Sequence, residues 1–175
     1  MKISRARFVV ASALGASAAL LVDGLTAAAA GADPRDLSTL NAAIELERAA
    51  IKAYDDAEGT KLLSPPVLRF AALFKGDHQA HLAALMAAVS AGGGVPSLAT
   101  AKLEYPQLAR EKDVIAFARS IEEKAAATYL SVLPDLRDRA LAQAAASILG
   151  VETMHVGILA DALGSFSPYP TGFVQ

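Results

Sequence analysis

The sequence predicts an all-α protein, a single bundle of four helices with a long crossover between the second and third helices. Alanine supplies 40 of the 175 residues, while β-branched and aromatic residues are sparse, a composition that favours helix over sheet. With 54% apolar and 19% charged residues, the chain is too apolar to be disordered and has the length of one domain. Four stretches repeat apolar residues with the spacing of a helix, and glycines or prolines separate them.

Residues 1–32 have the pattern of an export signal that is removed from the mature protein. Three basic side chains lie within the first seven residues, residues 8–22 form an uncharged apolar run, and residues 27–32 are alanine and glycine. The run of 15 residues is shorter than the roughly 20 needed to cross a bilayer, which favours a cleaved signal over a permanent membrane anchor. We expect an exported, periplasmic protein. The motif Arg5-Ala6-Arg7 leaves the choice between general and twin-arginine export open.

The mature chain, residues 33–175, is expected to form the bundle and an extended C-terminal tail. It keeps 13 basic and 17 acidic side chains, and this mildly acidic balance gives no electrostatic reason to bind nucleic acid. The chain has no cysteine, which excludes disulfide scaffolds, thiolate zinc sites and cysteine nucleophiles. Any metal ion must therefore be held by histidine and carboxylate side chains. A homo-oligomer is compatible with the sequence.

The first two predicted helices form a hairpin. The first covers residues 37–58, with Asp36 or Ser38 as its N-cap and Gly59 as its end. The second covers residues 65–91, after a Ser-Pro start and before three consecutive glycines. Because the connection between them is short, the two helices should be antiparallel neighbours.

The third and fourth predicted helices form a second hairpin. The third covers residues 111–133 and ends at Pro134, and the fourth uses Asp135 as its N-cap and extends to residue 163. The connection between the hairpins, residues 92–110, has 19 residues and reaches up to about 60 Å. A helix of ~25 residues is only about 38 Å long, so this connection is long enough to run the full length of the bundle.

Polar side chains interrupt the apolar stripe of every predicted helix. The first and third stripes each carry one glutamate, and the second and fourth each carry a polar pair at positions i and i+3. An ionised carboxylate in a dry core costs several kcal/mol unless it is paired, hydrogen-bonded or bound to a metal ion. Four helices with the same exception indicate one shared metal site. Its candidate ligands are Glu47, His78, His81, Glu122, Glu152 and His155.

The two hairpins have the pattern of a duplication. Glu47 lies seven residues before Tyr54, and Glu122 lies seven residues before Tyr129. The His-x-x-His of the second helix returns as Glu-x-x-His in the fourth, and a glycine stands two residues before each. Both patterns return after nearly the same distance along the chain. Such a repeat places the polar groups of both hairpins around a pseudo-twofold axis, an arrangement with which a four-helix bundle encloses metal ions.

On these motifs the chain resembles the ferritin-like domain family, in the exported, single-domain form related to rubrerythrin and ferritin. The resemblance covers essentially all four predicted helices and implies a ferritin-like four-helix bundle. In that family, single glutamates from two helices and a Glu-x-x-His motif from each of the other two bind a pair of iron or manganese ions. Carried to this chain, Glu47 and Glu122 match the single glutamates. Glu152 with His155 matches one motif, and His81 matches the histidine of the other.

His78 departs from the family pattern, because it stands where a glutamate bridges the two metal ions. A neutral imidazole offers one lone pair, whereas a carboxylate offers two oxygens. Three glutamates and three histidines bring a charge of about −3 to the site, against about −4 for the usual set. The resemblance therefore implies one ion, or two bound unequally. Iron is the expected metal, with manganese or zinc as alternatives.

Two functions are compatible with these residues. The leading one is an exported ferritin-like protein that binds iron or a similar metal in the bundle core for oxidant or metal handling. The alternative is a metal-free ferritin-like bundle that serves as a stress-associated structural or binding protein of the cell envelope. In the alternative, each buried glutamate pairs with a core histidine or tyrosine and no ion is bound. Whether the protein is an enzyme stays open in both.

Simpler roles remain open for four of the polar side chains. His78 and His81 have polar neighbours on the second helix, which is also compatible with a surface-facing edge. Tyr54 and Tyr129 are expected to pack in the core and to donate a hydrogen bond to a carboxylate, rather than to take part in redox chemistry.

Overall fold

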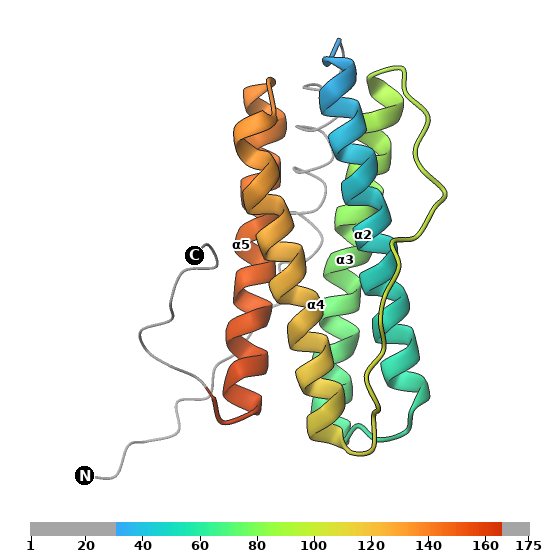
Figure 1. Cartoon of the computed structure of the whole chain (residues 1–175), viewed down its shortest axis with the longest axis vertical. Coiled ribbons are helices and arrows are strands. Elements are labelled where there is room, and N and C mark those ends of the chain that lie inside the picture. Colours follow the sequence, from blue (N-terminus) through green and yellow to red (C-terminus); the bar gives the residue numbers. More distant parts are fainter. Residues whose placement is uncertain (1–30, 166–175) are drawn as a thin grey trace, which may run out of the picture.

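A computed structural model of the chain describes residues 31–165. Within this range the chain forms four α-helices and one short 3₁₀ helix, without a strand. The helices are α2 (Pro34–Gly59), α3 (Pro65–Ala91), α4 (Glu111–Val132) and α5 (Arg139–Ala162). Figure 1 shows α2 and α3 as one antiparallel hairpin and α4 and α5 as another, joined by a long crossover along the bundle. The predicted four-helix bundle with its crossover is confirmed. The predicted export signal, apart from its last two residues, and the predicted tail after residue 165 lie outside the described residues.

The first helix, α2 (Pro34–Gly59), begins three residues earlier than predicted. Asp33 is its N-cap, and the Asp33 carboxylate accepts a hydrogen bond from the Arg35 backbone N–H at 2.8 Å. Pro34 stands at the first helical position, where its missing N–H costs nothing. The predicted caps, Asp36 and Ser38, are therefore wrong, because both already lie inside the helix.

Asp36 connects the two hairpins instead of capping a helix. The residue is only 1% exposed, and its two carboxylate oxygens accept hydrogen bonds from the backbone N–H groups of Arg137 and Asp138, at 3.1 and 2.9 Å. These two residues immediately precede α5 (Arg139–Ala162). The first turn of α2 therefore holds the start of α5 in place.

The second helix, α3 (Pro65–Ala91), has the predicted bounds, and its glycine turn has a steric reason. Gly93 has a φ of 78°, a conformation that side chains with a Cβ rarely adopt. The Gly94 N–H donates to the Val89 carbonyl at 2.9 Å, and a Cβ on Gly94 would lie 3.0 Å from the Val89 side chain. Glycine at both positions lets the chain leave α3 and enter the crossover.

The last two helices differ from the prediction at the point where they join. The third, α4 (Glu111–Val132), is followed by a 3₁₀ turn, η1 (Leu133–Asp135). Pro134 has no N–H to donate and fits the start of this turn, which carries the chain onward before α5 begins. Asp135 is therefore not a cap, and Asp138 caps α5 by accepting from two backbone N–H groups of its first turn.

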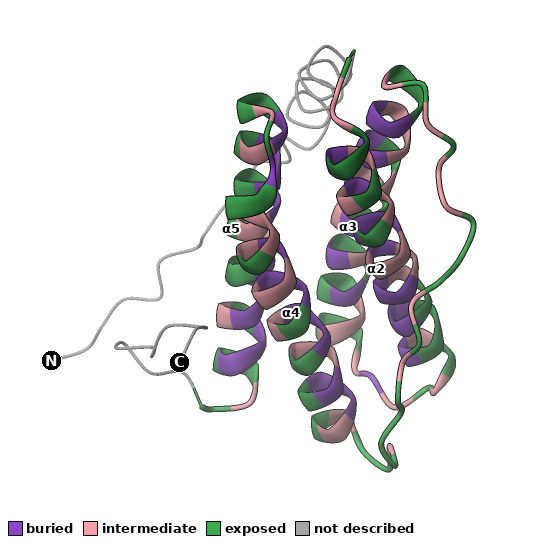
Figure 2. Cartoon of the chain, turned by 45° about the horizontal axis from the view of Figure 1, so that its top comes forward, coloured by how far each residue is buried: buried purple, intermediate pink, exposed green. Residues whose placement is uncertain are grey.

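The apolar core lies in two main clusters, one on each side of a central polar belt. Figure 2 shows that the buried faces of the helices turn toward one another. α5 has a length and composition that alone would suit a membrane span, and in this bundle it buries one face, including Leu141, Ile148 and Leu159. Phe70 on α3, one helical turn before the buried Phe74, is 47% exposed. One cluster includes Leu40, Ile44, Leu85, Tyr129, Leu136, Leu141 and Ile148, and the other includes Tyr54, Leu63, Phe74, Val114, Ile115 and Leu159.

The crossover, residues 92–110, is called the strap below. It forms hydrogen bonds to α2 at two positions along that helix. Near one end, the Ser97 hydroxyl donates to Glu45 and the Ser97 N–H donates to the Asn41 side chain, both at 2.7 Å. Near the other end, the Tyr105 hydroxyl donates to Asp56 at 2.6 Å. Leucines of the strap pack against a smaller buried cluster from α2 and α4. The strap therefore covers the face of the bundle formed by these two helices (Figure 1).

Candidate metal centre

All six predicted ligands meet in the belt between the two apolar clusters. Their exposed fractions lie between 0 and 4%. The surface-edge alternative for His78 and His81 is therefore wrong. Each helix supplies the residues that its stripe predicted: Glu47 from α2, His78 and His81 from α3, Glu122 from α4, and Glu152 and His155 from α5.

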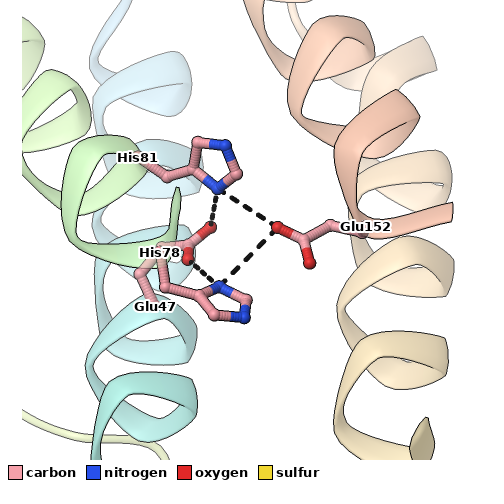
Figure 3. A group of neighbouring side chains, drawn as sticks. All are labelled: Glu47, His78, His81 and Glu152. Atoms are coloured by element: carbon pink, nitrogen blue, oxygen red, sulfur yellow. Dashed lines mark hydrogen bonds and ion pairs between the residues drawn. The ribbon is translucent and has the colours of Figure 1, made fainter. Parts of the chain in front are cut away.

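One half of the centre joins the first hairpin to α5. Figure 3 shows Glu47, His78 and His81 facing Glu152 across the bundle. His78 Nδ1 lies 2.8 Å from a Glu47 oxygen, and His81 Nδ1 lies 3.6 Å from the other Glu47 oxygen. His81 Nδ1 also lies 3.1 Å from Glu152. Nitrogen and oxygen atoms from three helices thus converge on one small volume.

The other half repeats this arrangement around Glu122. His155 Nδ1 lies 3.2 Å from one Glu122 oxygen and 3.7 Å from Glu152, while His78 Nε2 lies 3.2 Å from the other Glu122 oxygen. In each half, four potential ligand atoms lie within 4.8 Å of one another. His78 and Glu152 belong to both sets, so they occupy the shared positions between two potential ion sites. The sets are Glu47, His78, His81 and Glu152, and His78, Glu122, Glu152 and His155.

The two buried tyrosines cross between the hairpins. The Tyr54 hydroxyl on α2 donates to Glu122 on α4, and the Tyr129 hydroxyl on α4 donates to Glu47 on α2. The predicted tyrosine–carboxylate hydrogen bonds are confirmed. The Glu-to-Tyr spacing is the same in both hairpins. The tyrosine of each hairpin therefore donates a hydrogen bond to the glutamate of the other hairpin. Each single glutamate is thereby oriented by the opposite hairpin.

Two further residues, Asp77 and Phe74, contact His155, and the sequence pattern did not predict these contacts. His155 Nε2 lies 3.1 Å from an Asp77 oxygen, and the Phe74 ring stacks on the His155 ring with centroids 3.9 Å apart. Asp77 lies one position from His78, outside the apolar stripe, so periodicity assigned it to solvent. Its contact depends on how α3 packs against α5, which no local pattern specifies. Val151, in the corresponding position of the repeat, has no carboxylate to offer His81.

In the half of the centre that contains Glu47 and His81, burial and ion pairing shift the pKa values in opposite directions. Burial alone would raise the pKa of Glu47, but the imidazoles of His78 and His81 lower it to about 2. Burial alone would lower the pKa of His81, but Glu152 and Glu47 raise it to about 9. Pairing therefore dominates over desolvation for both partners. The charged forms of Glu47 and His81 stabilise one another in the metal-free protein.

The second half follows the same rule, with one exception. Burial opposes the charge of His155, but Asp77 and Glu122 raise its pKa to about 10. Burial likewise opposes the charge of Glu122, but His155 and His78 hold its pKa far below the ordinary range. Burial raises the pKa of Glu152 despite its histidine neighbours. Glu152 is thus the carboxylate whose charge the protein alone compensates least.

Glu152 provides the structural test of whether a metal ion fits this centre. Both of its carboxylate oxygens are buried, and within the described part of the chain neither has a hydrogen-bond partner. His81 Nδ1 approaches one of them at 3.1 Å but lacks hydrogen-bonding geometry, and this nitrogen is unsatisfied as well. A buried carboxylate left in this state is costly, and a coordinated cation would satisfy it. Carboxylate oxygen and imidazole nitrogen are donors that iron, manganese and zinc accept, so the residues fit a metal ion.

Comparisons with known proteins agree with this architecture. A family model for a ferritin-like domain matches residues 35–165. The fold of a conserved hypothetical protein from Mycobacterium tuberculosis superposes with a TM-score of 0.67, at 20% identity over 78% of this chain and 96% of that one. A crystal structure from Bacillus anthracis, described as ferritin-like and diiron-carboxylate, gives a TM-score of 0.65 at 21% identity, over 74% of this chain and 95% of that one. No curated protein matches the chain.

Proposed function

Because the chain belongs to the ferritin-like domain family, we propose that it binds iron or a similar metal ion at the bundle centre and uses it to handle oxidants or metal ions. The observation that carries this proposal is the buried Glu152 carboxylate, both oxygens of which are unsatisfied within the described residues while imidazole and carboxylate neighbours surround it. Bound iron would supply one-electron redox chemistry. The chain would supply the ligands, the exclusion of water and the orientation of each donor.

The ligands would divide between two positions of unequal strength. Glu47 with His81 would serve one position and Glu122 with His155 the other, with Glu152 shared between them. His78 is also shared, but a neutral imidazole donates a lone pair to only one ion. We therefore propose one firmly held ion and a weaker second position.

Asp77 would act on the centre by positioning His155. When the Asp77 carboxylate accepts the N–H of His155 Nε2, the lone pair of Nδ1 points toward Glu122 and the bundle axis. Phe74 stacks against the same ring and restricts its rotation. Both contacts would keep His155 in the orientation that ligation needs before any ion is bound.

Metal titration with thermal melting tests the proposal. The protein is stripped with a chelator and then mixed with Fe²⁺, Mn²⁺ or Zn²⁺, and elemental analysis counts the ions retained. An ion that binds only the folded state adds about 2.7 kcal/mol of stability at a hundredfold excess over its Kd, which raises the melting temperature. Metal-stripped protein that retains none of the three ions and shows no shift would contradict the proposal.

Neighbouring residues on α4 provide a matched pair of variants for this experiment. Glu122→Gln removes a carboxylate from the centre, whereas Glu123→Gln makes the same change to a partly exposed side chain paired with Arg119 at 2.8 Å. We expect the first variant to lose most of the metal-dependent melting shift and the second to keep it. Equal shifts in both variants would remove Glu122 from the ligand set.

One observation supports the alternative of a metal-free structural bundle. The two nitrogens of His78 lie 2.8 Å from Glu47 and 3.2 Å from Glu122, so a protonated His78 pairs two carboxylates internally without an ion. In that case no divalent ion changes the melting temperature. His78→Gln, which removes the internal cation, then destabilises the protein strongly. The titration above separates the two functions directly.

We also propose export to the periplasm. The support is the basic start, the short apolar run and the alanine-rich stretch within residues 1–32. Mass spectrometry of protein recovered from the periplasmic fraction is expected to find a chain that begins close to Asp33. Full-length chain in the cytoplasm or the membrane fraction would contradict this proposal.

A further inference from the structure

The charged side chains of the bundle are distributed unevenly among its helices. α2 and α4 carry most of them, and the strap covers the face that these two helices form (Figure 1). The α3/α5 face lies on the other side of the bundle. On these two helices Lys75 pairs with α2 and Glu152 is buried. Their other charged residues are Arg69, Asp77, Arg139 and Asp161, so most of the α3/α5 face is uncharged.

Four large apolar side chains are exposed on α3 and α5, at the end of the bundle where α3 begins and α5 ends. Phe70 and Leu73 of α3 are 47% and 44% exposed. Met154 and Ile158 of α5 are 60% and 40% exposed. These four residues are called the apolar patch below. Exposed apolar side chains that gather in one place mark a surface that binds a partner.

The metal centre shows that both halves of the apolar patch lie on the same face. Asp77 of α3 contacts His155 of α5 at 3.1 Å, so the two antiparallel helices turn these positions toward each other. Leu73 lies four residues before Asp77, and Ile158 lies three residues after His155. Residues at these spacings share one side of a helix. Leu73 and Ile158 therefore flank the same α3/α5 contact, at nearly the same height along the bundle.

One charge of each sign borders the apolar patch. Arg69 of α3 lies one residue before Phe70, and Asp161 of α5 lies three residues after Ile158. Both are exposed, and within residues 31–165 neither forms an ion pair. The patch thus has a positive edge on one helix and a negative edge on the other.

Two glycines of this face have no steric role within the single chain. Gly76 of α3 and Gly150 of α5 occupy equivalent positions of the sequence repeat, and both are exposed. A Cβ on either would meet nothing within 4 Å. Glycine in the interior of a helix is unfavourable relative to alanine. Close approach of another helix to this face would give both glycines a role.

We propose that the α3/α5 face binds the same face of a second copy of this chain, in a dimer with twofold symmetry. When the twofold axis runs parallel to the helices, α3 of each chain lies against α5 of the other at the same height. The α3 half of the apolar patch then packs against the α5 half of the other patch. Arg69 pairs with the partner's Asp161, and this contact occurs twice. The dimer requires no metal ion.

The face is large enough for a stable dimer. At about 1.5 Å per residue the 24 residues of α5 extend about 36 Å, and two adjacent helices are about 20 Å wide. The resulting area of about 700 Å² per chain is close to the roughly 800 Å² that each partner of a stable complex buries. A second copy fits better than a lipid surface, because membrane-binding faces carry lysine and arginine at their edges, whereas this patch has one edge of each sign.

Sedimentation equilibrium of metal-free protein tests the proposal. The unmodified protein is expected to have twice the mass of one chain. Leu73→Gln removes apolar surface from the patch and should raise the Kd of the dimer about tenfold or more. Leu98→Gln makes the same change at a strap leucine that is 84% exposed, and it should leave this Kd unchanged. Circular dichroism checks that both variants keep the helical fold.

Two charge variants make the test specific to contacts between copies. Arg69→Glu alone, or Asp161→Arg alone, places like charges opposite each other twice in the dimer, so each should weaken it about tenfold or more. In an equimolar mixture of the two variants, both contacts join opposite charges, so heterodimers should form. Native mass spectrometry distinguishes the heterodimer by its mass. Lys112→Glu, at an exposed position of α4, is the control and should stay dimeric.

Three results would overturn the proposal. The first is unmodified protein that stays monomeric up to about 100 μM. The second is a mixture of the two charge variants without heterodimers. The third is a monomer that floats with phosphatidylglycerol vesicles, which would assign the face to a lipid surface. Because the protein in these experiments is metal-free, failure of the proposed metal binding would leave the dimer untouched.

Discussion

His78 is the residue that most distinguishes this centre from a symmetric pair of sites. A glutamate in its place would offer one oxygen to each ion, whereas both nitrogens of His78 already face glutamates of the first and third stripes. The protein thereby replaces a shared anionic ligand with a group that is either neutral or cationic. The number of ions bound should depend on this single side chain.

Restoring a carboxylate at this position should increase the number of ions bound. His78→Glu adds two donor oxygens and one negative charge, so we expect the metal content to rise from one ion per chain toward two. Elemental analysis after dialysis measures this change. His78→Gln has a similar size without a charge and should not bind a second ion. A metal content that is the same in both variants would contradict the role given to His78.

The crossed tyrosines allow a second prediction at the scale of the residue. Tyr129→Phe removes the hydroxyl that donates to the buried Glu47, which should lower the free energy of unfolding by about 1–3 kcal/mol. Tyr105→Phe removes an exposed hydroxyl bonded to Asp56 and serves as the control, with an expected effect below about 1 kcal/mol. Urea denaturation of metal-free protein measures both. Similar losses in the two variants would show that the buried hydrogen bond contributes no more to stability than the exposed one.

At the scale of the element, the stability of each hairpin depends on contacts at the helix ends. α5 begins where Asp138 caps it and where the Asp36 carboxylate, on α2, holds the backbone just before it. Asp36 is buried, so its hydrogen bonds are protected from water. The start of α5 therefore depends on the first turn of a helix that lies far earlier in the chain.

Removing the Asp36 carboxylate should separate the ends of the hairpins. Asp36→Ala leaves two backbone N–H groups without their partner, and we expect a loss of about 1–3 kcal/mol in the free energy of unfolding. Asp135→Ala, at an exposed position that caps nothing, should change it by less than about 0.5 kcal/mol. Thermal melting of the two variants under the same conditions compares their losses of stability. The prediction fails if Asp135→Ala is the more damaging change.

At the scale of the whole molecule, the centre couples folding to pH. The pKa of His81 rises from 6.5 to about 9 and that of His155 to about 10, so their contributions are fully present below pH 6.5 and are lost as the pH rises through these values. The pKa of Glu47 falls from 4.5 to about 2, so its contribution is present above pH 4.5 and is lost as the pH falls toward 2. The pKa of Glu152 is raised, so this residue stabilises the folded protein more at low pH than at high pH.

The metal-free protein should therefore melt at the highest temperature between about pH 4.5 and 6.5. Metal ions compete with protons for the imidazoles, so the melting shift that a metal produces should grow as the pH rises toward the pKa values of His81, about 9, and His155, about 10. Melting curves with and without metal across this range measure both effects. A metal-free melting temperature that rises steadily to about pH 9 would contradict the ion pairing described for the centre.

The sequence by itself determined the four helices and the six residues that meet between them. Apolar residues at helical spacing specify which face of each helix turns inward, and that face carried the glutamates and histidines. The sequence likewise predicted that each buried tyrosine donates a hydrogen bond to a carboxylate. These features depend on periodicity within a single helix, and a helix has the same periodicity wherever it packs.

Only the tertiary structure decided which groups from different helices touch. The contact of Asp77 with His155 and the support of α5 by Asp36 join segments far apart in the chain, and the exposure of Phe70 depends on the neighbouring helices. Each is set by the rotation and height of one helix against another and by the path of the strap. Those quantities arise from packing the whole core at once, so no local pattern contains them.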